Sequence, residues 1–205
     1  PRAIMQILHG IAEFVELYGD FANFLTAEGI LVVAEDHMGH GGSVSEECVM
    51  GYFHGGWFAA VDDTCKLMQL TMAENPGVPY ILFGHSMGSF VARLYLAKYG
   101  AELKAAVICG TAGTNPAIGA AKLATALFSK TGPTKPGKIM NSLAFGSYNK
   151  KTDKRTAFDW LSVYEKNVDV YIDDPLCGFL FSNQGFRDLI TMNDYMMRQE
   201  VIDAA

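Results

Sequence analysis

The sequence predicts an α/β fold in which a mostly parallel sheet is flanked by helices. Short apolar segments alternate three times with segments of helical period, and the apolar segments are nearly continuous. Continuous apolar strands are typical of a parallel sheet that is covered on both faces. The 205-residue chain is long enough for one sizeable core, and its apolar content of 50% is that of a folded protein.

The first half of the chain supplies the sheet. Ala3–Gly10 predicts a buried strand that ends in a glycine turn, and the helical spacing of apolar residues before Glu28 predicts a helix that stops at Gly29. The later strands are expected, in order, at Ile30–Asp36, Tyr80–Gly84 and Leu103–Gly110, and the later helices at Trp57–Glu74 and Ser89–Tyr99.

The pattern changes after Gly110, where no strong strand follows. One helix is expected at Ala117–Phe128, followed by a Pro/Gly-rich loop, and short helices and loops rich in aromatic residues are expected over Thr156–Phe186. We therefore expect a core over residues 1–114, a helical cap or lid over residues 115–185 and a return helix of the core over residues 186–205. Arg187–Ala205 is expected to form that helix as one amphipathic segment.

Composition excludes several classes of function. The net charge is −6 and no lysine or arginine cluster exists beyond the short stretch Lys150–Arg155, so we expect no nucleic-acid surface. The four cysteines lie far apart without zinc spacing, so we expect no metal site and reduced thiols in a cytoplasmic protein. No apolar run approaches the length of a membrane span, so we expect no membrane-spanning segment, and we also expect no secretory segment.

The candidate catalytic residue is Ser86. It stands in the pattern G-x-S-x-G, between Gly84 and Gly88, where the sequence predicts that a strand passes directly into a helix. Such a turn forces the central residue into a strained conformation and requires small residues two positions away on each side. We interpret Ser86 as a nucleophile; the alternative is a glycine-flanked turn that only connects two elements.

A nucleophilic serine needs backbone N–H groups that stabilise an oxyanion. One donor is the residue after the nucleophile, Met87, and the second is expected from the loop after the first strand, where Ile11 follows His9 and Gly10. His9 itself stands at a strand end, where bracing the loop is the better interpretation than acting as a base.

Three ordered motifs carry a family resemblance: "LHGIAE", "VVAEDHMGHGGS" and "FGHSMGSFVARLY". Together they resemble the α/β-hydrolase superfamily, and within it the bacterial monoacylglycerol lipases and lysophospholipases, which are S33 serine aminopeptidase-like. The resemblance implies Ser86 as the nucleophile, Ile11 and Met87 as backbone donors, no cofactor, and a small-molecule or lipid ester as substrate. It also implies a cap that admits the acyl chain and offers a surface for peripheral membrane contact.

The catalytic aspartate and histidine expected of this fold are not found in the chain. In the fold an acid and then a histidine follow the serine, whereas no histidine here follows Ser86. The five histidines are His9, His37, His40, His54 and His85. The later aspartates do not follow a predicted late strand, and we interpret Asp188 and Asp194 as exposed helix positions.

Two hypotheses follow. The first is a serine carboxylic-ester hydrolase acting on single-acyl lipids, with amide or thioester substrates left open because a fold does not fix the substrate. The second is a truncated, catalytically incompetent fragment that self-associates as a homo-oligomer or needs a complementary segment, as the start at Pro1 without methionine and the end at Ala205 suggest. We expect the 205-residue chain alone to be a poor esterase.

Overall fold

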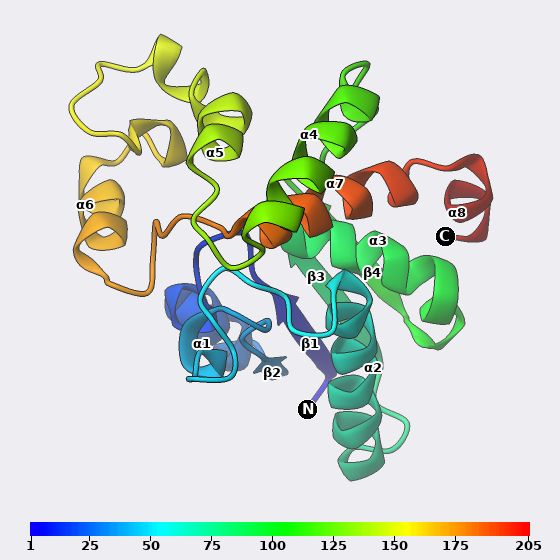
Figure 1. The fold of residues 1–205 in the computed structure, drawn as a ribbon. Helices are drawn as coiled ribbons and strands as arrows, with labels where there is room; N and C mark the ends of the chain where they lie inside the picture. Colours follow the sequence, from blue (N-terminus) through cyan, green and yellow to red (C-terminus); the bar gives the residue numbers. More distant parts are fainter.

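The computed structural model describes residues 1–205 and contains one four-stranded sheet in the order β2-β1-β3-β4 (Figure 1). The strands are β1 (Ala3–Leu8), β2 (Ile30–Ala34), β3 (Tyr80–His85) and β4 (Ala105–Cys109), and every pairing is parallel. The predicted α/β class and all four predicted strands are therefore confirmed.

The register of the strands decides where the candidate site lies. Leu8 pairs with Gly84, and His85 pairs with Cys109. The loops that leave β1, β3 and β4 therefore emerge at the same edge of the sheet, as in other parallel α/β sheets. The Ser86 N–H also donates to the Cys109 carbonyl at 2.9 Å, which ties the candidate serine to the end of β4.

Most of the core lies on one face of the sheet. The helices α2 (Trp57–Glu74) and α3 (Met87–Tyr99) pack there against β1 and β3, within a cluster of 22 buried residues. Two later helices, α7 (Asn183–Met196) and α8 (Gln199–Ala204), contribute to the same cluster. Burial of this apolar surface is the main source of stability of the fold.

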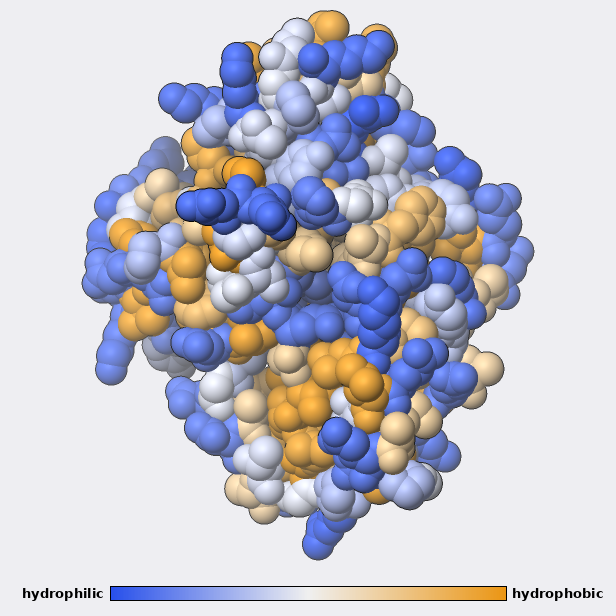
Figure 2. Space-filling view, turned by 60° about the horizontal axis from the view of Figure 1, so that its bottom comes forward, coloured by the Kyte–Doolittle hydropathy of each residue, from blue (hydrophilic) through white to orange (hydrophobic).

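The opposite face of the sheet is only partly covered. Helix α1 (Gly19–Ala27) packs on this face and follows the 3-10 turn η1 (Val15–Tyr18). The apolar cluster there contains only three buried residues. On β4, Val107 is 44% exposed. A continuous apolar patch is visible on the molecular surface (Figure 2), and a partly uncovered sheet is the kind of feature that produces one.

The region after β4 is helical. It contains α4 (Ile118–Thr131), α5 (Lys138–Phe145) and α6 (Glu165–Asp173), and the short 3-10 turns η4 (Tyr148–Lys151) and η5 (Asp159–Leu161) lie between α5 and α6. The helix expected at Ala117–Phe128 is confirmed as α4, which packs along α7. Helix α5 was not expected, because it directly follows a Pro/Gly-rich stretch. The division into core, cap and return helix stays a prediction.

The prediction of one helix over Arg187–Ala205 is wrong, because two helices occupy this segment. Helix α7 begins earlier, at Asn183, where the Ser182 Oγ accepts from the Gly185 N–H at 2.9 Å and caps the helix. It ends at Met196, before α8 begins at Gln199. None of the helices in the structure has both the length and the apolar character of a membrane span.

Candidate active site

Ser86 occupies a sharp turn between β3 and α3. Its backbone angles are φ 51° and ψ −118°, a positive φ that is rare outside glycine. A Cβ on Gly84 would lie 2.5 Å from the Gly88 carbonyl oxygen, and a Cβ on Gly88 would lie 2.1 Å from the Leu8 carbonyl oxygen. Both glycines are therefore required by close backbone approach, as the sequence pattern predicted.

The loop that follows β1 lies directly beside this turn. A Cβ on Gly10 would lie 3.1 Å from the Ser86 Cβ. The Ile11 N–H has no hydrogen-bond acceptor in the protein, and Met87 is buried at the first position of α3, where a helix leaves its N–H without an intrahelical partner. These positions suit the predicted donors, and the roles of Ser86, Ile11 and Met87 stay predictions.

A partly buried carboxylate joins the loop to the residue before Ser86. The Glu13 Oε1 accepts from the Gly10 N–H, from the Tyr18 hydroxyl at 2.6 Å and from the His85 Nδ1 at 3.1 Å. Burial by itself would raise the pKa of Glu13, but the hydrogen bonds from His85 and Tyr18 outweigh it and hold that pKa below its usual value. Glu13 thus fixes the loop after β1 against the end of β3.

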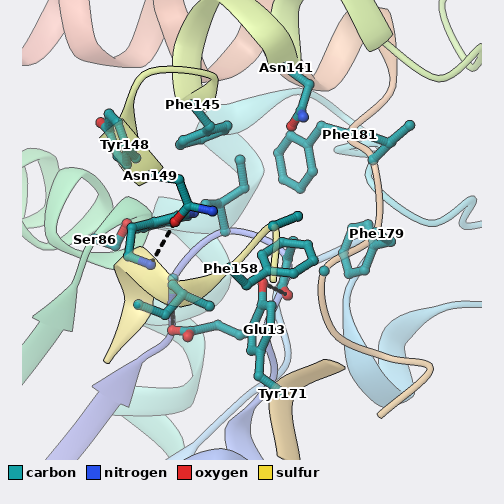
Figure 3. A pocket seen from close by; sticks show the side chains of 18 of the residues that line it. Glu13, Ser86, Asn141, Phe145, Tyr148, Asn149, Phe158, Tyr171, Phe179 and Phe181 are labelled. Atoms are coloured by element: carbon teal, nitrogen blue, oxygen red, sulfur yellow. Dashed lines mark hydrogen bonds between the residues drawn. The ribbon is translucent and has the colours of Figure 1, made fainter. Parts of the chain in front are cut away.

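A pocket of about 690 Å³ opens above Ser86 and the loop after β1 (Figure 3). Its volume is in the range that proteins use for small-molecule ligands. The aromatic part of its wall consists of Phe145, Tyr148, Phe158, Trp160, Tyr171, Phe179 and Phe181, and the polar part includes Glu13, Asn141, Ser142 and Asn149. Phe128, an aromatic residue of the helical region after β4, does not line the pocket.

Three histidines form a buried cluster instead of a catalytic site. The His9 Nδ1 donates to the Gly10 carbonyl at 2.8 Å, while its Nε2 accepts from the His37 N–H at 3.0 Å. The rings of His37 and His40 lie 4.4 and 5.0 Å from that of His9. Burial lowers the pKa of His9, lowers that of His37 well below its usual value and lowers that of His40 to about 3. All three are therefore neutral near pH 7, and the bracing role expected of His9 is confirmed.

The Ser86 Oγ makes no hydrogen bond to any histidine. The nearest along the chain, His85, uses its Nδ1 to bond the Tyr18 hydroxyl at 2.8 Å as well as Glu13, and His54 is exposed in the loop before α2. The structure therefore brings Ser86 together with Gly10, Ile11 and Met87 but places no base at the serine.

The expectation that Asp188 is an exposed helix position is wrong. Its side chain is only 6% exposed on α7, where the Gln184 Nε2 donates to the Oδ1 at 3.1 Å and the Oδ2 has no partner. Burial raises the pKa of Asp188 to about 6. Asp194 is half-buried and accepts from the Lys122 Nζ at 2.7 Å. Neither carboxylate lines the pocket of Ser86.

No cluster of three or more ligating side chains in the structure is arranged to hold a metal ion. All four cysteines are free thiols; three are buried, and Cys109 is exposed at the end of β4. The methionines near the end of the chain do not line the pocket either, since Met192 and Met196 are buried in the main core.

Comparison with known proteins identifies the family. The family model described as serine aminopeptidase, S33, matches residues 1–201. The chain belongs to this family. A human monoglyceride lipase is 28% identical over 176 residues, which make up 86% of this chain and 52% of the relative. A monoacylglycerol lipase from Mycolicibacterium smegmatis is 32% identical over 143 residues, which make up 70% of this chain and 49% of the relative.

Solved structures agree with this assignment. A thermostable carboxyl esterase from Bacillus coagulans matches with a TM-score of 0.90 and 26% identity, covering all of this chain and 67% of that chain. The resemblance to α/β-hydrolases is therefore confirmed. The chain spans about half the length of the curated relatives it matches.

Several residues of the site were not singled out from the sequence. Glu13 belongs to the "LHGIAE" motif, but its role in holding the loop depends on Tyr18 and His85, and the latter is 72 positions away. Asn141, Asn149 and Tyr171 reach the pocket from the region after β4. Only the aromatic richness of that region indicated that it would form a pocket wall.

Proposed function

We propose that the protein is a serine carboxylic-ester hydrolase that acts on single-acyl lipids, such as monoacylglycerol or lysophospholipid, through an acyl-enzyme on Ser86. The observation that carries this proposal is the strained position of Ser86 at the base of a pocket with an aromatic wall. A serine held on such a turn is exposed to an incoming carbonyl carbon, and the pocket wall suits an acyl chain.

The chemistry requires charge stabilisation at the carbonyl oxygen. When the Ser86 Oγ attacks the ester carbon, the carbonyl oxygen becomes negative, and the N–H groups of Ile11 and Met87 are the proposed donors to it. Donors fixed before the reaction contribute on the order of 10²–10³-fold in rate, since they need no rearrangement as the charge develops. The lipase and esterase relatives support this class of reaction.

The proton of Ser86 needs an acceptor that residues 1–205 do not place beside it. We propose that a competent base reaches Ser86 from outside these residues, either from a further segment or from another chain. Without it, the elbow and the oxyanion donors would retain only a small part of the rate enhancement, as triad variants of other serine hydrolases do.

The test of this proposal is hydrolysis of a monoacylglycerol and of a lysophospholipid by the purified protein, with release of free fatty acid as the readout. We expect slow turnover that Ser86→Ala abolishes, while Ser162→Ala, a change outside the pocket, leaves the rate unaltered. Turnover that survives Ser86→Ala would refute the proposed nucleophile. Rapid turnover that depends on Ser86 would refute the claim that residues 1–205 place no base beside the serine.

An incompetent fragment that self-associates is the second candidate. The partly uncovered face of the sheet supports it, since exposed apolar strands such as β4 promote association with another chain. Unlike the hydrolase proposal, this candidate predicts no covalent reaction at Ser86.

A further inference from the structure

We propose that Tyr171 is a positioning residue that holds the loop Gly10–Glu13 by its Ala12 carbonyl, so that the helical region after β4 sets the geometry of the oxyanion donor Ile11. The inference rests on the proposed function, because the exact position of the Ile11 N–H matters chemically only if it stabilises an oxyanion. Tyr171 belongs to α6, and 159 positions separate it from Ala12.

The Ala12 carbonyl is the point of attachment. It accepts two hydrogen bonds from beyond the sheet, one from the Tyr171 hydroxyl at 2.8 Å and one from the Gly178 N–H at 2.9 Å. Ala12 also has a φ of 54°, a left-handed conformation that costs a residue with a side chain about 1 kcal/mol or more. A strained turn persists only where surrounding contacts hold it, and these two bonds are such contacts.

The other end of the loop is attached to the sheet. The Gly10 N–H donates to Glu13, whose carboxylate is held by Tyr18 and His85. The Ile11 N–H, which has no acceptor of its own, lies between this attachment and the one at Ala12. Its direction is therefore set by both attachments, and releasing either would let the donor rotate away from Ser86.

The hydroxyl of Tyr171 is itself held in place by packing. Its ring makes an edge contact with Phe158 at a centroid distance of 5.3 Å, and both rings lie against Gly178. A Cβ at Gly178 would lie 3.0 Å from the Phe158 Cζ, and the φ of 65° also favours glycine there. In Figure 3, Tyr171 extends beside Phe158 on the same side of the pocket as Glu13.

Amide hydrogen exchange tests whether the attachment reaches the loop. In Tyr171→Phe, one hydrogen bond is lost, so we expect the amides of Gly178 and Gly10 to exchange about fivefold faster. Tyr164→Phe is the matched control, since Tyr164 is exposed just before α6 and its hydroxyl makes no hydrogen bond. Unchanged exchange at Gly10 in Tyr171→Phe would overturn the proposal.

The reaction of Ser86 with an alkyl fluorophosphonate at pH 9 tests the positioning role. We expect Tyr171→Phe to lower the maximal inactivation rate about fivefold, without changing the concentration that gives half of that rate, because the donor and not the pocket is affected. A change in the half-maximal concentration alone would mean that Tyr171 is only a wall of the pocket. If Ser86 of the wild type does not react at all, the proposed function fails. The hydrogen exchange at Gly10 then remains as the test of whether Tyr171 holds the loop.

Discussion

At the scale of single residues, buried polar groups account for most of the organisation around Ser86. Glu13 gathers three donors on one oxygen, and His9 links the loops that follow β1 and β2. Each of these groups is satisfied by partners, which is the condition under which a polar side chain can be buried without a large loss of stability. Asp188 differs, since one of its carboxylate oxygens has no partner, and the Nε2 atoms of His37 and His40 also lack one.

Asp188 predicts a measurable pH dependence. Its pKa is raised to about 6 in the folded protein from the ordinary value of 3.8. Folding therefore takes up a proton between these values, so burial of the ionised carboxylate destabilises the protein above pH 6 and not below pH 4. We expect the free energy of unfolding of Asp188→Asn, relative to that of the wild type, to rise by roughly 2–3 kcal/mol from pH 4 to pH 8. Urea unfolding at both pH values measures this, and a pH-independent difference would contradict it.

Local residue spacing predicted one part of the site and not the other. Gly84, Ser86 and Gly88 were predictable because the constraint on the turn acts within five positions of the chain. The burial of Asp188 depends on how α7 packs, and the bond between Tyr171 and Ala12 joins segments far apart in sequence. Contacts of this kind leave no periodic signal.

At the scale of secondary-structure elements, the junction of β3 and α3 is the most constrained part of the fold. We expect Gly88→Ala to reduce the free energy of unfolding by at least about 3 kcal/mol, because its Cβ would overlap the Leu8 carbonyl of the neighbouring strand. Gly119→Ala is the matched control in the first turn of α4, where an added Cβ meets nothing within 4 Å and should change the free energy of unfolding by no more than about 0.5 kcal/mol. Equal effects of the two changes in urea unfolding would contradict this explanation of the elbow.

The helix boundary that the sequence predicted wrongly is one that tertiary contacts set. The end of α7 is marked by no glycine or proline, and the Arg93 guanidinium of α3 reaches the Met196 carbonyl at 3.5 Å there. A side chain that caps a helix from another element cannot be read from the helix sequence. The strands were predictable because each is a nearly continuous apolar run with a length typical of buried parallel strands.

At the scale of the whole molecule, the two faces of the sheet differ in how well they are covered. One face carries α2 and α3, with α7 and α8 packed on these helices, and the other face carries only α1. Sequence patterns predicted a sheet flanked by helices, but the number of helices on each face is a property of the connections in space. The uncovered part favours contact with another apolar surface.

We expect the purified protein to self-associate through this face. In sedimentation velocity, the average mass should rise with protein concentration, and Val107→Glu on β4 should suppress the rise, because a carboxylate would have to be buried in the contact. Leu123→Glu is the matched control: Leu123 is 75% exposed, on α4. A constant monomer mass for the wild type, or equal effects of the two changes, would contradict the expectation.

The most direct test of the central claim is the pH dependence of covalent labelling by a fluorophosphonate, with peptide mapping of the modified residue. Our account predicts labelling at Ser86 that is lost in Ser86→Ala. It also predicts a rate that keeps rising from pH 6 to pH 9, because hydroxide must take the proton that no histidine in these residues accepts. A rate that levels off near pH 7 would show a competent base at Ser86. Labelling elsewhere, or none in the folded protein up to pH 9, would contradict the assignment of Ser86 as the nucleophile.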